Sequence, residues 1–147
     1  MLEIPAGLLE RIRKHALETY PCEACGILVG LDGNVRRVVE IHRAENLKGA
    51  AGHDRFEIDG LFFKKTSDAA EAKKLRVIGF YHSHPDHPAR PSPTDADFAG
   101  ESEKGMGWPD HSFMILSIED GELADCRSWV FGPGTSFVEE PIEKTRD

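Results

Sequence analysis

The sequence predicts an α/β (α+β) fold in which helices flank a mixed β-sheet. Apolar runs of strand length alternate irregularly with amphipathic segments of helical period, and two pairs of runs are separated only by short turns rich in Asp and Gly. The chain has 147 residues and contains no internal repeat, low-complexity tract or linker. We therefore expect residues 1–147 to form a single domain, which is long enough to bury a core without disulfides.

Two helices are predicted in the first half of the chain. Pro5 suits the first turn of a helix, and Pro21 ends the same segment directly after Tyr20. Between them, apolar side chains recur at helical spacing: Leu8, Leu9, Ile12, Ala16 and Leu17. Asp59 can cap a second helix over about residues 60–75, with the following side chains available to its buried side: Leu61, Phe62, Ala69, Ala72 and Leu75.

Strands and loops are predicted between these helices. Residues 25–31 and 35–42 flank an Asp-Gly-Asn turn and predict a hairpin. Residues 45–55 show no periodicity and include several small side chains, which predicts a mobile loop, and residues 56–58 predict a short strand. The run Val-Ile-Gly-Phe-Tyr at 77–81 is typical of a buried strand.

The last third of the chain predicts a further hairpin and short elements at its borders. An Asp-Gly turn separates the two strands of this hairpin. In order, we expect a helix over residues 94–104, a loop over 105–110, hairpin strands over 112–118 and 123–131, an edge strand over 138–142, and a frayed tail over 143–147.

The stretch after the 77–81 strand carries side chains that suit a transition metal. His82 and His84 are two residues apart at the end of a strand, so their side chains project from the same face. Asp95 can return a carboxylate to this point if the intervening Pro-rich loop folds back. Two histidines and one carboxylate leave a fourth position for water, which is the arrangement of catalytic rather than structural zinc.

Local explanations compete with this interpretation. A His-x-His pair is often only two polar residues on a half-exposed strand. Ser92 at the N-cap, Pro93 at the first helical position and Asp95 at the third also form a capping box, which is sufficient to begin a helix. The local pattern alone does not separate a metal site from a helix start.

The cysteines offer another alternative. Cys22 and Cys25 form a Cys-x-x-Cys motif, which together with the two histidines could build a closed Cys₂His₂ structural zinc site. They could equally be inert small residues of the core. The total of three cysteines is odd and argues against a disulfide framework.

Taken together, the spaced residues resemble the signature of the JAMM metallopeptidases, also called the MPN-plus domain. The signature reads His82-x-His84-Pro85, six residues, and then Ser92-x-x-Asp95. It also includes an upstream glutamate just before a Gly-rich apolar strand, and Glu23 occupies that place. The resemblance extends over roughly residues 4–131, and none of its five positions departs from the pattern.

This resemblance implies a fold, a cofactor and a role for each residue. The fold would be the JAMM/MPN (cytidine-deaminase-like) architecture. One zinc ion per chain would be bound by His82, His84 and Asp95. Glu23 would be the general acid and base, and Ser92 would support the oxyanion. Without the resemblance, Glu23 would be taken for an ordinary exposed carboxylate.

The compactness of the chain resembles bacterial stand-alone members of the family, which act on ubiquitin-like sulfur-carrier proteins. The resemblance therefore implies a zinc peptidase or isopeptidase that hydrolyses the amide bond after the C-terminal Gly-Gly of such a carrier and releases cysteine or another adduct. Two alternatives remain: a zinc hydrolase of small amides, which the same residues would serve, and a non-catalytic MPN scaffold or binding module.

Composition excludes several other classes of partner. The chain has 18 Lys and Arg against 26 Asp and Glu, a formal net charge of −8, which disfavours binding to nucleic acid or to an anionic membrane. No run approaches the ~20 apolar residues of a membrane span. Glutamates interrupt residues 1–20, so we expect no secretory signal and a cytoplasmic protein. The oligomeric state is not predicted.

Overall fold

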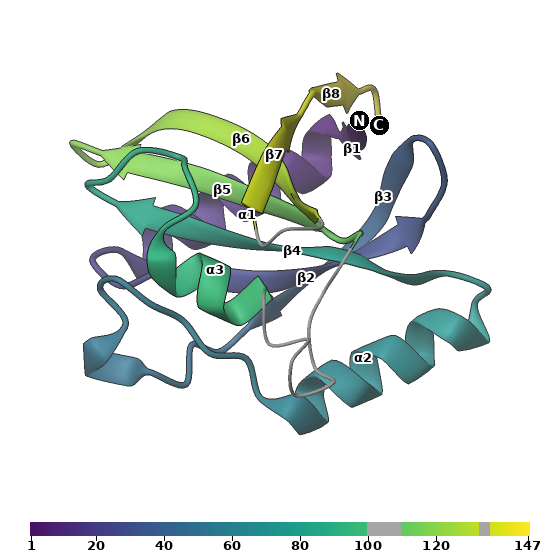
Figure 1. Ribbon diagram of the computed structural model, residues 1–147, viewed down its shortest axis with the longest axis horizontal. Helices are drawn as coiled ribbons and strands as arrows, with labels where there is room; N and C mark the ends of the chain where they lie inside the picture. Colours follow the sequence, from purple (N-terminus) through teal and green to yellow (C-terminus); the bar gives the residue numbers. More distant parts are fainter. Residues whose placement is uncertain (100–109, 133–135) are drawn as a thin grey trace.

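The computed structural model describes residues 1–99, 110–132 and 136–147. These residues form a curved sheet with helices on both sides (Figure 1). In chain order the elements are β1 (Leu2–Pro5), α1 (Ala6–Thr19), β2 (Cys25–Leu31), β3 (Arg36–Ala44), a short 3-10 helix (Gly49–Ala51), α2 (Gly60–Ala72), β4 (Arg76–Pro85), α3 (Pro93–Ala99), β5 (Ser112–Glu119), β6 (Glu122–Gly132), β7 (Ser136–Glu140) and β8 (Ile142–Thr145).

The strands form one mixed sheet in the order β7-β6-β5-β4-β2-β3-β1-β8. The two predicted hairpins, β2 with β3 and β5 with β6, are antiparallel. The pairs β4 with β5 and β1 with β8 are parallel. The predicted class, a mixed sheet with flanking helices, is confirmed.

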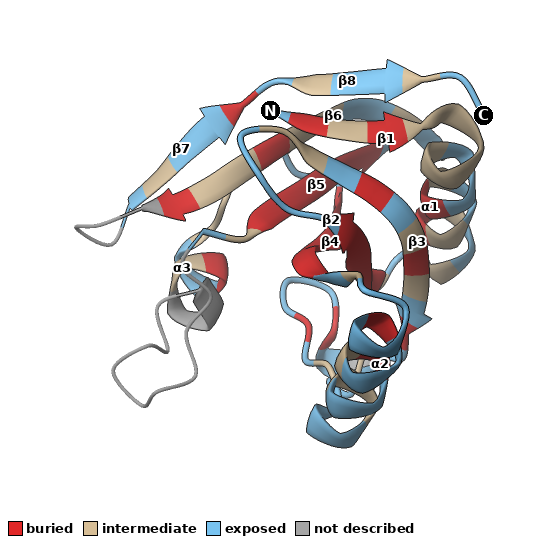
Figure 2. Cartoon of the chain, turned by 90° about the vertical axis from the view of Figure 1, so that its right-hand side faces the viewer, coloured by how far each residue is buried: buried red, intermediate tan, exposed pale blue. Residues whose placement is uncertain are grey.

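Alternate side chains of the central strand β4 face different helices. Tyr81 belongs to the core that packs under α1, whereas Phe80 belongs to the core under α2. β4 is buried from its second residue to its end (Figure 2). Because side chains alternate along a strand, His82 and His84 share the face of Phe80.

Three predictions about strands are wrong, and each concerns pairing between distant parts of the chain. The first strand, β1, was not predicted, because four residues give little local signal. The tail is not frayed over its whole length, since Ile142–Thr145 pairs with β1. Residues 56–58 form no strand in the described structure and are part of the loop that begins after β3.

Helix α2 is present, but its buried face differs from the prediction. Phe62 N–H donates to the Asp59 carboxylate at 3.2 Å, which confirms the expected cap. Thr66 and Ala70 are buried, and Phe62, Phe63 and Leu75 pack beside them. The remaining expected side chains lie outside this face: Leu61 is 59% exposed, and Ala69 and Ala72 are also exposed.

The predicted helix over 94–104 is described only as far as Ala99, and the predicted loop over 105–110 lies outside the described residues except for Asp110. Among the helices described, none combines the length and the apolar character needed to cross a membrane.

Helix α1 is joined to β4 by a hydrogen bond between His15 and Tyr81. The Tyr81 hydroxyl lies 2.7 Å from His15 Nδ1, within hydrogen-bond distance of the ring. The tyrosine ring crosses Gly26 of the neighbouring strand, where an added Cβ would lie 2.1 Å from a ring carbon. Burial lowers the pKa of His15 to about 4, because the charged imidazolium would lose its water.

We expect this histidine to make the fold less stable in mild acid. The unfolded chain takes up a proton at His15 below about pH 6.5, whereas the folded protein resists until about pH 4, so stability falls across that window. Part of the ring is exposed, so the loss in unfolding free energy between pH 7 and 5 should be about 1–2 kcal/mol. Urea unfolding of the metal-free protein at both pH values measures it.

His15→Gln should remove this part of the pH dependence, because glutamine does not titrate. His53→Gln is the matched control, since His53 is exposed on the loop after β3 and should leave the dependence unchanged. Identical pH dependence in His15→Gln and in the wild type would contradict the prediction.

Candidate metal centre

The two histidines lie at the end of the central strand. β4 continues to Pro85, beyond the predicted 77–81, because it pairs with β2 as far as His82 and with β5 as far as Pro85. Both rings are buried, and their Nε2 atoms lie 3.1 Å apart. The expectation that His82 and His84 project from one face is therefore confirmed.

Asp95 reaches the histidines from the first turn of α3. Its Oδ1 lies 3.1 Å from His82 Nε2, and its Oδ2 lies 3.1 Å from His84 Nε2. The capping box is present as well: Ser92 N–H donates to Asp95 Oδ2 at 2.8 Å, and Asp95 N–H donates to Ser92 Oγ at 3.1 Å. The capping interpretation is therefore confirmed, and the cap also holds Asp95 in an orientation in which its carboxylate faces both histidines.

Glu23 lies on the approach to β2 and points toward the same place. Its N–H donates to the Gly52 carbonyl at 2.6 Å, and its carbonyl accepts from the Asn46 amide at 3.1 Å. Its side chain is 3% exposed, and Oε1 is buried with no hydrogen-bond partner in the described structure. One ligand atom from each of Glu23, His82 and His84 falls within 4.8 Å of the others.

Burial shapes the protonation of these groups. Loss of water raises the pKa of Glu23 to about 8. Burial also disfavours the charged form of Asp95, but His82 and His84 outweigh it and hold its pKa well below the usual range. Burial lowers the pKa of His82, whereas the hydrogen bond and charge of Asp95 overcome burial at His84 and raise its pKa.

The site has the donor set of a cation site. His84 Nδ1 lies 2.8 Å from the Pro88 carbonyl, which can only accept, so Nδ1 carries a proton and in the neutral ring Nε2 presents a lone pair. His84 Nε2 faces His82 Nε2 and Asp95 Oδ2, each 3.1 Å away, and His82 Nε2 faces Asp95 Oδ1 at the same distance, so four possible ligand atoms are gathered at one point. Imidazole nitrogens and carboxylate oxygens are ligands that suit zinc, so the residues fit the expected metal.

The cysteines do not join this group. Cys25 is buried beside Ala44 and Phe56, where burial raises the pKa of its thiol to about 12. The Cys22 thiol lies 3.6 Å from the Gly49 carbonyl on the loop after β3. Within the described residues, the group able to hold a metal contains no sulfur. The arrangement does not favour a closed Cys₂His₂ site: Cys25 is a core residue, as one alternative expected, whereas Cys22 is only half-buried.

Comparison with known proteins identifies the family. Residues 5–132 match the family model described as prokaryotic homologs of the JAB domain. The chain belongs to the JAMM metallopeptidase family. The JAMM fold, the membership and the metallopeptidase class implied by the sequence resemblance are confirmed.

Individual relatives of this JAMM domain cover most of its length. It is 32% identical over 117 residues to a desampylase from Haloferax volcanii, which spans 80% of this chain and 77% of the relative. It is 30% identical over 145 residues to a CysO-cysteine peptidase from Mycobacterium tuberculosis, spanning 97% and 90%. A solution structure of a protein from Desulfitobacterium hafniense superposes with a TM-score of 0.83 at 28% identity, covering all of this chain and 94% of the other.

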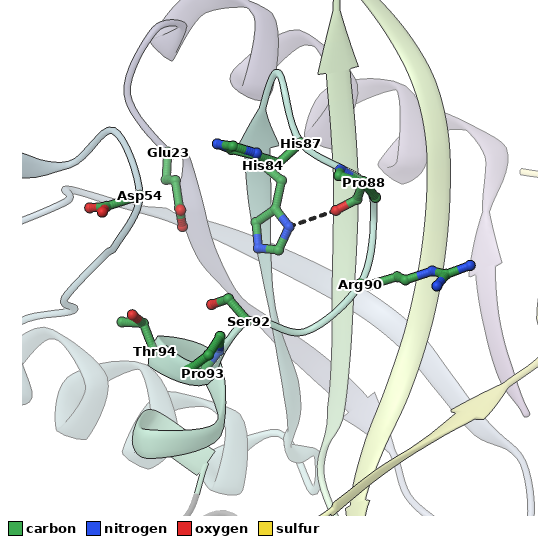
Figure 3. Close-up of a pocket in the computed structure, with 9 residues that line it drawn as sticks. All are labelled: Glu23, Asp54, His84, His87, Pro88, Arg90, Ser92, Pro93 and Thr94. Carbon is green, nitrogen blue, oxygen red and sulfur yellow. Dashed lines mark hydrogen bonds between the residues drawn. The ribbon is translucent and has the colours of Figure 1, made fainter.

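A cleft of about 380 Å³ opens the JAMM site to solvent. Figure 3 shows Glu23, His84 and Ser92 pointing into one space, with Asp54 beside Glu23, whereas the Arg90 side chain points away. The full lining comprises Glu23, Asp54, His84, His87, Pro88, Arg90, Ser92, Pro93 and Thr94. Asp54 was not among the predicted site residues, because it lies in a loop with no periodicity or motif to indicate it.

Proposed function

We propose that this JAMM domain is a zinc-dependent peptidase that hydrolyses the amide bond after the C-terminal Gly-Gly of a ubiquitin-like sulfur-carrier protein. The observation that carries the proposal is the convergence of two imidazole nitrogens and a carboxylate beside a buried, unpaired glutamate oxygen at an open cleft. A scaffold would not need this arrangement, because unpaired buried polar atoms are costly to the fold.

The names of two relatives support the substrate class. One is a desampylase and the other a CysO-cysteine peptidase, and each name describes removal of a group from a conjugate. The assignment of the chain as a JAMM-type peptidase does not depend on which carrier protein it cleaves.

The proposed ligands of the zinc ion are His82, His84 and Asp95. When bound, zinc supplies Lewis acidity, which acidifies a water molecule and polarises the scissile carbonyl. Glu23, whose Oε1 has no hydrogen-bond partner in the described structure, accepts the proton of the attacking water and delivers it to the departing amine. In the metal-free protein burial raises the pKa of Glu23 to about 8, which favours the protonated form that delivers the proton, whereas the positive charge of a bound cation would favour the carboxylate that accepts it.

Ser92 can donate a hydrogen bond to the oxyanion. Its Oγ accepts from Asp95 N–H as part of the cap, and a hydroxyl that accepts in this way can still donate its own hydrogen. The side chain points into the cleft beside His84 (Figure 3). A donor in this position stabilises negative charge as the carbonyl is attacked, and loss of one such donor typically costs about 3–4 kcal/mol of transition-state stabilisation.

The carrier specificity is testable by changing the residues on each side of the scissile bond. A side chain on the last carrier residue would crowd His84 and Ser92, so replacing that glycine with valine should reduce kcat/KM at least about tenfold. Changing the residue after the bond should have a much smaller effect. Cleavage rates are measured by mass spectrometry on matched carrier adducts.

Equal cleavage of the glycine and valine carriers would contradict the proposal. Turnover of small amides without cleavage of any carrier would instead establish the alternative, a small-amide hydrolase.

A further inference from the structure

The two histidine rings of the site are held by different means. The His84 ring is fixed by its Nδ1–H, which donates to the Pro88 carbonyl at 2.8 Å. The Nδ1 of His82 is buried and has no hydrogen-bond partner in the part of the chain that the structure describes. Metal-binding histidines are usually oriented by a hydrogen bond to the second ring nitrogen, so something else must orient His82.

Phe56 lies against the face of the His82 ring. The ring centroids are 4.6 Å apart and the planes are inclined by 28°, which is a stacked arrangement. Phe56 is 7% exposed and packs in a small core cluster with Cys25 and Ala44, to which Phe62 of α2 is joined. An aromatic ring stacked on one face of the imidazole restricts its rotation about χ2. The stacked ring does not lie in the imidazole plane, so it does not block the direction in which either ring nitrogen would bind a ligand.

We propose that Phe56 is the positioning residue of His82 and replaces the missing hydrogen bond to Nδ1. The inference rests on the metal site of the proposed function. Phe56 has no polar atom to compete for the metal, and its ring excludes water from one side of the imidazole. It does not contact the substrate in this role, and it acts only through the orientation of His82.

The side-chain amide of Asn46 anchors the backbone around Phe56 through four hydrogen bonds. Asn46 Nδ2 donates to the carbonyls of Glu23 and Arg55, each at 3.1 Å. Asn46 Oδ1 accepts from Lys48 N–H at 3.0 Å and from Glu57 N–H at 3.1 Å. The amide therefore holds the residues on either side of Phe56 and the backbone of Glu23, so the aromatic ring is fixed relative to the site.

The test compares zinc affinity in matched variants, measured by competition with a chelator, together with thermal unfolding of each metal-free protein. Phe56→Leu should weaken zinc binding about tenfold or more, the usual effect of removing a residue that orients a metal ligand. Phe56→Tyr keeps the ring and should remain within about threefold of the wild type. Phe62→Leu is the matched control, because Phe62 packs on the same cluster and, in the described residues, stacks on neither histidine.

Phe62→Leu should lower the unfolding temperature without weakening zinc binding more than about twofold, since it leaves the stack on His82 in place. Phe56→Met, a change that largely conserves volume, replaces Phe56→Leu if the latter does not fold. The inference is overturned if Phe56→Leu, or Phe56→Met in its place, binds zinc as tightly as the wild type. It is also overturned if Phe56→Tyr or Phe62→Leu loses as much zinc affinity as Phe56→Leu. A wild-type protein that binds no zinc would overturn the proposed function itself, which is a distinct result.

Discussion

Glu23→Gln should leave zinc bound and lower turnover at least about 100-fold, because an amide cannot take the proton of the attacking water. The substitution preserves the size of the side chain, and Glu23 Oε1 has no hydrogen-bond partner to lose in the described structure. Zinc content is measured by elemental analysis, and turnover by release of the adduct from a carrier. A variant that keeps more than about a tenth of wild-type turnover would contradict the role of general base.

The same variant separates two possible ligand sets. Glu23 lies as close to the histidines as a metal ligand would, and Asp95 contacts both of them. If Glu23→Gln lost its zinc, Glu23 would be a ligand rather than the proton acceptor. Glu57→Gln is a suitable control, because Glu57 is an exposed carboxylate on the neighbouring loop and should change neither zinc content nor turnover.

His84→Ala should abolish zinc binding and hydrolysis together. The ring lies 3.1 Å from both His82 Nε2 and Asp95 Oδ2, so its removal takes away one of the two nitrogens and leaves the carboxylate with a single imidazole partner. The loss of zinc affinity should exceed the 100-fold that removal of an outer supporting residue can cause. Chelator competition and activity on the same preparation measure it.

His87→Ala is the matched histidine control. His87 is three residues further along the chain, just after β4, and lines the cleft, but it is exposed and is not part of the group of closely spaced ligand atoms. This variant should retain zinc. Loss of zinc from His87→Ala, or its retention in His84→Ala, would show that the ligand set is different.

The sequence predicted elements whose signals are local. The β5–β6 hairpin is an example. Asp120 and Gly121 both have positive φ, as a tight hairpin turn requires, and an Asp-Gly pair in a sequence is typical of such a turn. The edges of the sheet were not predictable in this way. β1 pairs with β3 and β8, which are distant in the sequence, and residues 56–58 pair with none of the described strands.

The same distinction applies to the site. The residues of the proposed site could be named from the sequence because they lie on one strand, on the residues just before β2 and α3, and in the first turn of α3, at spacings that a motif can record. Asn46 and Phe56 were not, because their roles depend on how a loop without periodicity folds over β2 and β4. A hydrogen-bonding hub and a stacked ring have no fixed spacing from the residues that they support.

The order of the strands also determines when the sheet can be completed. β7 and β8 follow one another in the chain but occupy opposite edges, and buried Glu140 at the end of β7 accepts from Ser128 of β6 at 2.7 Å and lies 3.8 Å from Arg36 of β3. The strand β1 therefore acquires its outer partner from residues far along the chain, since Leu2 pairs with Ile142. Such pairing has a high contact order and a large loop-closure entropy, which slows its formation. β2 and β4, which carry the proposed site, lie in the interior of the sheet and can pair before the closing strand β8 is in place.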